Sequence, residues 1–392
     1  MYVECHILQN FAPSNLNRDD AGNPKDVTFG GFRRGRISSQ CLKRAVRMEF
    51  ARDGSLPPDL LGTRTKRLVS EIARRLVVAG RPPDSAAAVA AAAVASAGFT
   101  LVGEQKTQYL LYLGQAEIEE LARLCETHWE PLLAASAPDS TEAAAPSGAT
   151  KKGKRGSKPS AVPPGIAKEI AGFLRNGGRS VDVALFGRML ADLPGQNVDG
   201  ACQVAHALST NRMEVDFDYY TAVDDLKPDD SAGADMIGVV EMDSGCFYRY
   251  SNVNVRELTA NLGGDLEVSR RALDAYLRAT IAAVPSGKQH STAAQNPPSL
   301  ILCVVREKGL WSLVNAFVDP IAPGAEGDLV ARSIRALDRY WGSLVAMYGE
   351  AGVGAKYLCA LGEAPLAHLE AARVPNVDDM VRRTVESAFP SA

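Results

Sequence analysis

The sequence predicts an α+β protein with a ferredoxin-like core. Two observations support this prediction. Stretches of strand type and amphipathic helical stretches follow one another as strand, helix, strand and then again strand, helix, strand, with insertions between them. No internal repeat at a fixed period interrupts this order.

The composition is that of a soluble globular protein. The chain has 392 residues, of which 46% are hydrophobic and 23% charged, so it holds one large domain with elaborations or two domains. The formal charge of −3 and the sequence pI near 6.0 argue against indiscriminate binding of polyanions. Any contact with nucleic acid must therefore come from local clustering of positive charge.

The seven cysteines are scattered singly, without a CxxC pair. This pattern is typical of reduced thiols in a cytoplasmic protein and indicates neither a disulfide framework nor a zinc site. The start "MYVECHILQN" lacks the features of a signal peptide, and the alanine-rich run "SAAAVAAAAVASAGFTLVG" predicts a packed helix rather than a membrane span. We expect a soluble, cytoplasmic protein without a membrane partner.

The first elements are a strand and a helix. The stretch "YVECHILQNF" alternates apolar residues at Val3, Cys5 and Ile7, which predicts a half-buried strand. A helix is predicted near Ser39–Arg52, with apolar positions every fourth residue at Leu42, Val46 and Phe50. Residues 60–135 are predicted to be mostly helical, because apolar residues recur there with helical period.

Composition changes sharply in the segment 136–165. It is rich in Ser, Ala, Gly, Pro and Lys and has almost no large apolar residue, so it cannot offset its ordering entropy and predicts a flexible loop. Its basic run "KKGKRGSK" is able to touch a phosphate backbone, but a solvated tether is the favoured interpretation.

Order returns with "RSVDVALFGRM", which predicts a strand ending at a glycine. Residues 199–244 are polar and β-branched without a strong core pattern, as expected for an extended β-hairpin arm. The remaining elements are a strand in "SGCFYRYSNVNV", a helix in "LEVSRRALDAYLRATIAAVP", a buried strand in "SLILCVVRE" and a helix in "LVARSIRALDRYWGSLVAMYG".

One short stretch of the chain is strongly basic, although the whole chain has a net negative charge. "FGGFRRGRISSQCLKRAVR", residues 29–47, holds six arginines and lysines and no acidic residue. On the predicted helix a polar stripe opposes the apolar one, formed by Gln40, Lys43, Arg44 and Arg47. Ser38 or Ser39 is suited to cap this helix, and its first-turn amides suit an anion. Glycines at 30, 31 and 35 permit close approach of a ligand. Phosphate binding is therefore favoured over a merely solvated basic face.

The stretch "LNRDDAGNPKDVTFGGFRRGRISSQCLKRAVR" closely resembles the start of the CasC family, the backbone subunit of the type I-E CRISPR Cascade complex. The resemblance continues in "VDVALFGRM", "VDGACQVAHALSTNRMEVDFDYYTAVDDL", "SGCFYRYSNVNV", "NLGG" and "GKQHSTAAQNPP". It covers roughly residues 1–60 and 180–300 strongly and the C-terminal part loosely. The segment 136–165 resembles an insertion relative to shorter relatives, so the resemblance implies nothing for it.

This resemblance implies a fold shaped like a right hand. An RRM-like palm is expected from residues 1–60, 176–198 and 245–392, helical fingers from 61–175, and a thumb from 199–244. Copies of such a subunit polymerise along the CRISPR RNA (crRNA) and present its spacer to a target DNA strand. The implied partners are crRNA, target DNA, further copies and the other Cascade subunits: the crRNA-processing endonuclease, the crRNA 5′-end capping subunit, the large PAM-recognising subunit and the small subunits.

The resemblance also implies which residues contact RNA. They are Arg18, Lys25, Arg34, Arg36, Ser38, Gln40, Lys43, Arg44, Arg47, Arg188, Met189 and Lys288. Met189 matches a palm position beside the RNA, where it is expected to wedge against a distorted base step. The aromatic signature with which RRM domains stack bases is absent, so base identity should not be read directly.

Two other classes of function stay open at this point. Metal-dependent RNA cleavage would need converging carboxylates, and the available pairs are Asp19–Asp20 and Asp224–Asp225. For these pairs, and for the histidines His6, His206 and His290, structural roles are favoured. No nucleophile motif or Walker loop is present, so we expect neither catalysis nor a metal or cofactor. A scaffold that oligomerises without nucleic acid would leave the basic stripe unexplained.

Overall fold

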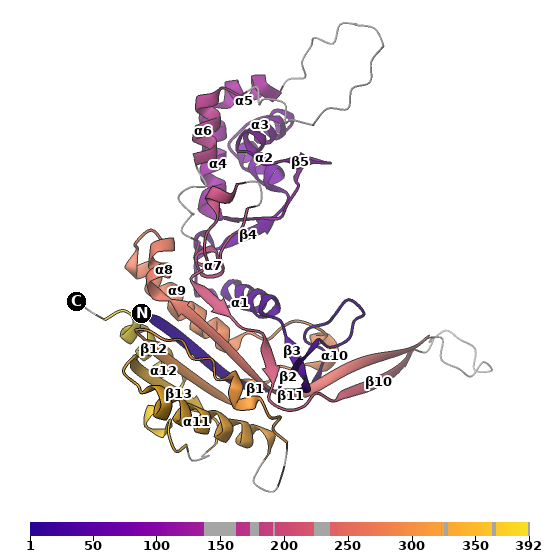
Figure 1. Cartoon of the computed structure of the whole chain (residues 1–392). Coiled ribbons are helices and arrows are strands. Elements are labelled where there is room, and N and C mark those ends of the chain that lie inside the picture. Colours follow the sequence, from indigo (N-terminus) through magenta and orange to yellow (C-terminus); the bar gives the residue numbers. More distant parts are fainter. Residues whose placement is uncertain are drawn as a thin grey trace, which may run out of the picture. The chain divides into compact units, whose positions relative to one another are not determined.

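The computed structural model describes residues 1–136, 162–172, 180–190, 193–222, 236–322, 324, 328–362 and 366–390. The chain forms two compact units (Figure 1). The first unit comprises residues 1–56, 201–259 and 265–392, and the second comprises 57–200 and 260–264. Residues 180–198, expected with the palm, fall in the second unit. Most of the predicted loop, 137–161, lies outside the described residues.

The first unit is built on an antiparallel sheet with strand order β13-β12-β1-β11-β9-β3-β2. Two further strands, β8 and β10, pair with β11. The strands are β1 (Tyr2–Ser14), β2 (Asp26–Phe29), β3 (Phe32–Ile37), β8 (Cys202–Val204), β9 (Ala207–Ser209), β10 (Val215–Ala222), β11 (Met236–Asn254), β12 (Leu300–Arg306) and β13 (Val353–Ala360). The chain is thus a mixed α+β protein, as the sequence predicted.

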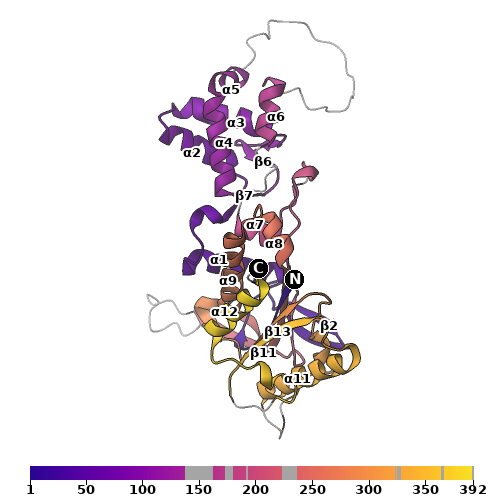
Figure 2. The same cartoon turned by 90° about the vertical axis from the view of Figure 1, so that its left-hand side faces the viewer.

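Helices cover both faces of this sheet (Figures 1 and 2). The helical segments of the unit are α1 (Ser39–Asp53), α8 (Val255–Asn261), α9 (Leu266–Ala282), α10 (Gln289–Thr292), η4 (Val314–Phe317), α11 (Leu329–Tyr348), η5 (Glu370–Ala372) and α12 (Val377–Ala388). Helix α11 packs on β1 and β11, and its Leu337 and Trp341 join a core with Tyr248 and Leu302. Helices α1, α9 and α12 pack together on the other face.

Strand β1 is buried on both faces from Val3 to Gln9 rather than half-buried. It lies between β11 and β12, and helices cover both of its faces. The odd-numbered Cys5 and Ile7 face one layer, whereas Glu4 and His6, expected on a solvated face, are 0% exposed. Glu4 is stabilised there by an ion pair with the buried Arg306. Apolar and polar side chains do alternate along β1, but both faces of the strand are buried.

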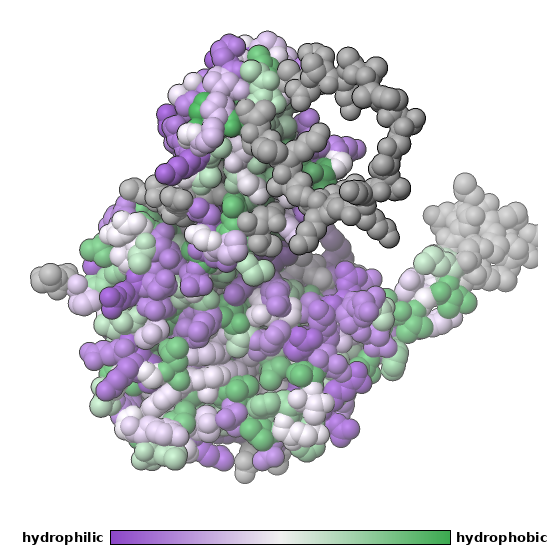
Figure 3. Space-filling view, turned by 45° about the horizontal axis from the view of Figure 1, so that its top comes forward, coloured by the Kyte–Doolittle hydropathy of each residue, from purple (hydrophilic) through white to green (hydrophobic). Residues whose placement is uncertain are grey.

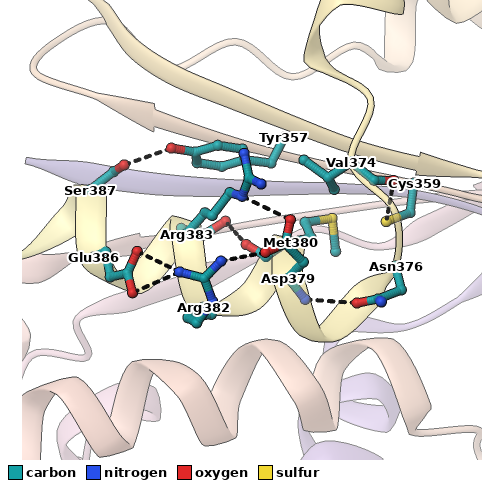
Figure 4. A network of polar contacts seen from close by, with 11 residues as sticks. Tyr357, Cys359, Val374, Asn376, Asp379, Met380, Arg382, Arg383, Glu386 and Ser387 are labelled. Carbon is teal, nitrogen blue, oxygen red and sulfur yellow. Dashed lines mark hydrogen bonds and ion pairs between the residues drawn. The ribbon is translucent and has the colours of Figure 1, made fainter.

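Polar contacts order helix α12, and one of them joins it to the edge strand β13 (Figure 4). Asn376 caps the helix, because its Oδ1 accepts from the Asp379 amide at 2.9 Å. The Tyr357 hydroxyl of β13 lies 2.8 Å from that of Ser387. Arg382 forms ion pairs with the carboxylates of Asp379 and Glu386. These exposed contacts connect successive turns of α12.

A hairpin extends the sheet. The first part of β11 pairs with β10, from Val215 opposite Asp243 to Ala222 opposite Met236, and among the described residues only Asp243 of this part also pairs with β1. Apolar side chains are exposed along it (Figure 3), namely Phe217, Tyr219, Tyr220, Met236, Ile237 and Val239. The predicted arm 199–244 is therefore too long at its start, because β8 and β9 pair with β11 inside the sheet.

The second unit is mainly helical. Its elements are η1 (Pro58–Leu60), β4 (Gly62–Thr65), α2 (Leu68–Val78), α3 (Pro83–Ser96), β5 (Leu101–Val102), β6 (Lys106–Thr107), β7 (Leu111–Gly114), α4 (Gln115–Thr127), α5 (Trp129–Ser136), α6 (Pro164–Gly172), α7 (Val181–Phe186) and η3 (Pro194–Gln196). The mostly helical character predicted for 60–135 is confirmed. Val162 is 4% exposed within the helical core, so the packed chain resumes before the predicted loop end at residue 165.

The stretch predicted as a strand before Gly187 is the helix α7. Its alternating Val181, Val183 and Leu185 suggested period two, but the intervening Asp182 and Ala184 are buried as well. A short helix that is buried all round carries no periodic signal that separates it from a strand. Gly187 ends it with φ of 79°.

Candidate nucleic-acid interface

Helix α1 begins at the end of the basic strand β3. Ser38 is its N-cap, and the Ser38 Oγ accepts from the Cys41 amide at 3.3 Å. The Ser38 amide in turn donates to Asn17 Oδ1 at 2.8 Å, which ties the loop 15–25 to the helix. The predicted apolar positions Leu42, Val46 and Phe50 are buried, which confirms that face of the helix.

The opposite side of α1 forms one wall of a groove of about 800 Å³. The other walls are the loop 16–22 and the segment 284–287. Three arginines line the groove, Arg18, Arg44 and Arg52. Of the remaining predicted helix residues, Gln40 is exposed and Lys43 and Arg47 are half-exposed. The structure thus brings α1 and Arg18 together around one basic hollow.

Two acidic residues also reach this groove, Asp19 and Asp20. Asp19 has a structural task, because its Oδ1 accepts from the Asn23 amide at 2.8 Å. The prediction that this aspartate closes a turn on its own backbone is confirmed. With three arginines against two aspartates, the lining keeps a net positive charge that favours an anionic ligand.

Lys288 stands beside the groove because of a close backbone approach. Gly287 lines the groove, and a Cβ atom there would collide with the carbonyl oxygen of Leu16. Only glycine lets the two segments pass so closely. The next residue, Lys288, is exposed and has φ of 54°.

Lys25 and Arg36 line a small adjoining cavity rather than the groove itself. The Arg36 Nε donates to the Asp26 carbonyl at 3.1 Å, and its Nη1 lies 3.3 Å from His206 Nδ1. The same His206 nitrogen accepts from the Ser39 amide at 3.3 Å. His206 was predicted in the arm with a structural role, and the structure places it between β8 and β9, beside the start of α1.

The surroundings of His206 keep its ring neutral. Partial burial lowers its pKa, and the charges of Arg36 and Lys25 lower it further. A neutral ring can accept the Ser39 amide, whereas an imidazolium cannot. No spacing or charge pattern in the sequence links this histidine to the basic helix, which lies 167 residues away along the chain.

The groove is also lined by a cysteine, Cys41. Burial raises its pKa, and the positive charges of Lys25 and Arg44 oppose that rise only in part. Its Sγ donates to the Leu16 carbonyl at 3.9 Å. A protonated, hydrogen-bonded thiol packs the groove floor and is not an activated nucleophile.

Arg34 was predicted to contact RNA, but its guanidinium is turned into the protein. The residue is 0% exposed. Its Nη1 donates to the carbonyls of Ser209 and Thr210, and its Nη2 to those of Phe317 and Val318. These bonds occupy the side chain, so Arg34 does not belong to the candidate interface.

Arg188 and Met189 belong to the second unit. Arg188 is 4% exposed, and its Nη1 lies 2.8 Å from the Glu117 carboxylate in a buried ion pair. This guanidinium is engaged in the core, which argues against the predicted contact of Arg188 with RNA. Met189 is 82% exposed, as a residue that meets a ligand would be.

Known proteins are similar to this chain in sequence and in fold. The model of the family described as CT1975-like protein matches residues 3–385. The chain belongs to the CT1975-like protein family. A chain of the solved structure "CRISPR RNA-guided surveillance complex, pre-nicking" is 33% identical with a TM-score of 0.82, over 99% of this chain and 100% of that chain. Another, from "CRISPR RNA-guided surveillance complex", is 29% identical with a TM-score of 0.73, over 99% and 100%. Among curated proteins none matches.

The histidines His6 and His290, considered for catalysis, have different surroundings in this CT1975-like chain. His6 is 0% exposed, and its Nδ1 lies 2.9 Å from the Tyr248 hydroxyl. Burial lowers the pKa of His6 to about 3, with a contribution from Arg306, so it is a neutral packing residue, as predicted. His290 is exposed on α10. Asp224 and Asp225 lie outside the described residues.

The described part of this CT1975-like chain holds no cluster suited to a metal ion. No group of three or more histidines, cysteines and acidic residues in the described ranges is arranged as a ligand set. Within those same ranges, no helix has both the length and the apolar character that crossing a bilayer requires.

Proposed function

We propose that this CT1975-like chain is a non-catalytic, crRNA-binding backbone subunit of a type I-E Cascade surveillance complex. Its copies line up along the crRNA spacer and present it for pairing with invading DNA. The observation that carries the proposal is the groove of Arg18, Arg44 and Arg52 along α1, in a chain 33% identical over 99% of its length to a chain of a CRISPR RNA-guided surveillance complex.

The chemistry of the groove suits the sugar-phosphate backbone of a single strand. Arginine and lysine side chains neutralise phosphates and position a strand without reading its sequence. Arg18, Arg44 and Arg52 surround the groove, and Lys288 stands at its margin. Lys43 and Arg47 continue the stripe along α1, and Lys25 and Arg36 extend the positive charge toward β3.

The fold supports a hand-like arrangement of functions. Strands β12, β1, β11 and β9 are adjacent in that order, and α1 and α9 share one face, which is the arrangement of an RRM-like, ferredoxin-like palm. The second unit corresponds to the fingers, and the hairpin of β10 and β11 to the thumb. Met189, exposed on the second unit, contacts the RNA beside a distorted step.

The partners follow from this role. They are crRNA, the target DNA strand paired with it, further copies of the chain, and the other Cascade subunits: the crRNA-processing endonuclease, the crRNA 5′-end capping subunit, the large PAM-recognising subunit and the small subunits. The complex acts in the cytoplasm in antiviral defence. The subunit itself holds the guide and leaves cleavage to other components.

Purification from a host that expresses a CRISPR array tests this function. The absorbance ratio at 260 and 280 nm and a denaturing gel report any bound RNA. RNA of uniform length that co-purifies with multimers of the chain is the expected result. Protein free of nucleic acid that degrades added RNA only with a divalent metal would instead identify an endoribonuclease, and multimers without RNA a plain scaffold.

A further inference from the structure

One wall of the groove belongs to a segment with little regular structure. The segment 283–296, which we call the groove loop, follows α9 and contains the short helix α10. Its residues 284–287 line the groove, and Lys288 stands at the groove margin. The buried residues of the groove loop are Ala283, Pro285 and Ala294, and the others are exposed or half-exposed. Apolar packing therefore supplies few of the restraints that fix its backbone.

The backbone of the groove loop has a shape that needs restraints. Lys288 has φ of 54° and Ala293 has φ of 47°, a left-handed conformation that residues with a side chain rarely adopt. Such residues persist where the surrounding structure holds them in place. Gln289 provides one internal brace, because its Nε2 donates to the carbonyls of Pro285 at 3.1 Å and Ala294 at 3.2 Å.

Two buried side chains of the sheet reach the ends of the groove loop. They are Gln9 on β1, 0% exposed, and Arg249 on β11, 5% exposed. Arg249 Nη2 donates to the Thr280 carbonyl in the last turn of α9 at 2.7 Å, and Gln9 Nε2 donates to the Asn296 carbonyl at 2.7 Å. Arg249 Nη1 also donates to Gln9 Oε1. The two side chains thus form one continuous connection between the two ends of the loop.

The chemistry of both ends suits these donors. The last carbonyls of a helix lack intrahelical partners and carry the negative end of the helix dipole. The guanidinium of Arg249 therefore stabilises the end of α9, from which the groove loop departs. At the other end, Asn296 has a second bond to β1, because its Oδ1 accepts from the Ala12 amide at 3.3 Å.

We propose that Gln9 and Arg249 are positioning residues for RNA binding, which hold both ends of the groove loop and thereby keep Gly287 against Leu16 and Lys288 at the groove margin. The inference deepens the proposed function and rests on it, because RNA is the ligand of the groove. The described residues that line the groove include neither Gln9 nor Arg249. Their effect on RNA is transmitted through the backbone of the groove loop.

The variant Gln9→Glu tests this role, because it separates the two bonds of Gln9. A carboxylate still accepts from Arg249, but it has no N–H to donate to the Asn296 carbonyl. Hydrogen exchange of the full chain without RNA should therefore become faster in residues 283–296. Gln9→Met, which adds no charge, lacks the same bond and should show the same change. It also keeps the test decisive if the buried carboxylate prevents folding.

The second readout is the contribution of Lys288 to the binding of a short oligouridine. In the wild type, Lys288→Ala should lower the slope of log affinity against log salt by about 0.7, as for one phosphate contact. In the Gln9→Glu and Gln9→Met backgrounds, the same change should lower the slope by less than about half of that amount, because a displaced loop no longer presents Lys288 to the strand.

Tyr248→Phe is the matched control. Tyr248 is the residue before Arg249, is 2% exposed, and its hydroxyl accepts from the Leu313 amide at 2.8 Å, away from the groove loop. This variant should keep the wild-type exchange in residues 283–296 and the full effect of Lys288→Ala.

Bonds that only stabilised the sheet would lower the free energy of unfolding and leave the groove loop and Lys288 as in the wild type. Unchanged exchange in residues 283–296, or an equal effect of Lys288→Ala in every background, would therefore overturn the positioning role. So would a wild-type slope that does not depend on Lys288. Failure of the wild type to bind oligouridine at all would instead overturn the proposed function, and this inference with it.

Discussion

Arg34 Nη2 donates to the carbonyl oxygen of Phe317 at 2.8 Å, across 283 residues of sequence. The same guanidinium donates to Ser209, Thr210 and Val318. A side chain in the middle of the basic stretch thereby connects strand β3 to β9 and to the end of η4. Its charge faces backbone carbonyls inside the protein rather than a ligand.

Arg34→Met should destabilise the fold strongly. The change leaves buried carbonyl oxygens unsatisfied, and we expect the free energy of unfolding to fall by about 3 kcal/mol or more. Chemical denaturation followed by circular dichroism measures it. The control is Arg33→Ala, one residue earlier, where the side chain is 62% exposed and the expected change is within about 0.5 kcal/mol. Equal effects of the two variants would contradict the fastening role.

Asp243 should make the stability of the protein depend on pH. The residue is 6% exposed where β11 passes from the sheet into the hairpin. Burial raises the pKa of its carboxyl from 3.8 to about 7, with Asp216 and Asp26 adding to the rise and a backbone bond from Ser244 opposing it. A folded-state pKa above the unfolded value means that the folded state binds the proton more tightly.

The contribution of Asp243 is therefore fully present below the unfolded pKa and is lost as pH rises toward the folded pKa of about 7. Between these values the free energy of unfolding should fall by up to about 1.4 kcal/mol per pH unit. Asp243→Asn should remove this slope and be the more stable protein at pH 8 or so. The matched control is the exposed Asp20→Asn, and a slope that persists in Asp243→Asn would contradict the assignment.

Some of this architecture follows from local rules. Helix α1 was predictable because its apolar residues recur every fourth position and Ser38 stands where an N-cap is needed. The alternation in β1 located the strand, but its burial on both faces depends on α11 and α12, which lie far along the chain. Periodicity reports which residues share a face and not what covers that face.

The candidate site divides in the same way. Arg18 and Arg44 share a groove because loop and helix are close in sequence and tied through Asn17 and Ser38. In the sequence alone, Arg34 and Arg188 cannot be told apart from Arg18 and Arg44. Their partners include Phe317 and Glu117, which only the tertiary fold brings near. Whether an arginine meets solvent or a distant carbonyl is not encoded in its neighbours.

The segment 137–161 should be dispensable for RNA binding. Its composition, poor in large apolar residues, supports no packing. A short Gly-Ser replacement of 137–161 should leave the unfolding midpoint and the RNA-bound multimer unchanged. Val162→Ala is the contrasting change, because Val162 is 4% exposed in the helical core and its truncation should cost about 1 kcal/mol or more. Disappearance of the multimers on replacement would identify the segment as an interface.

The hairpin should impose a fixed period on target recognition. An arm that crosses the guide of a neighbouring copy must displace a base, at a cost of a few kcal/mol. Target mismatches at the displaced positions should then be tolerated at regular intervals, and mismatches between them should weaken binding. Single mismatches tiled across a target give this profile. Absence of any period, or RNA-bound multimers that survive replacement of 215–243 by a short turn, would contradict the crossing.

The central claim is that the surface along α1 binds RNA phosphates without reading sequence. The direct test is the salt dependence of RNA affinity for the wild type and for Lys43→Ala combined with Arg47→Ala. The control removes two exposed arginines of the second unit, Arg74→Ala combined with Arg123→Ala. The α1 double variant should bind all RNA sequences more weakly by the same factor, and its slope of log affinity against log salt should fall by about 0.7 for each phosphate that it no longer neutralises. An unchanged slope, or weaker binding confined to some sequences, would contradict the claim.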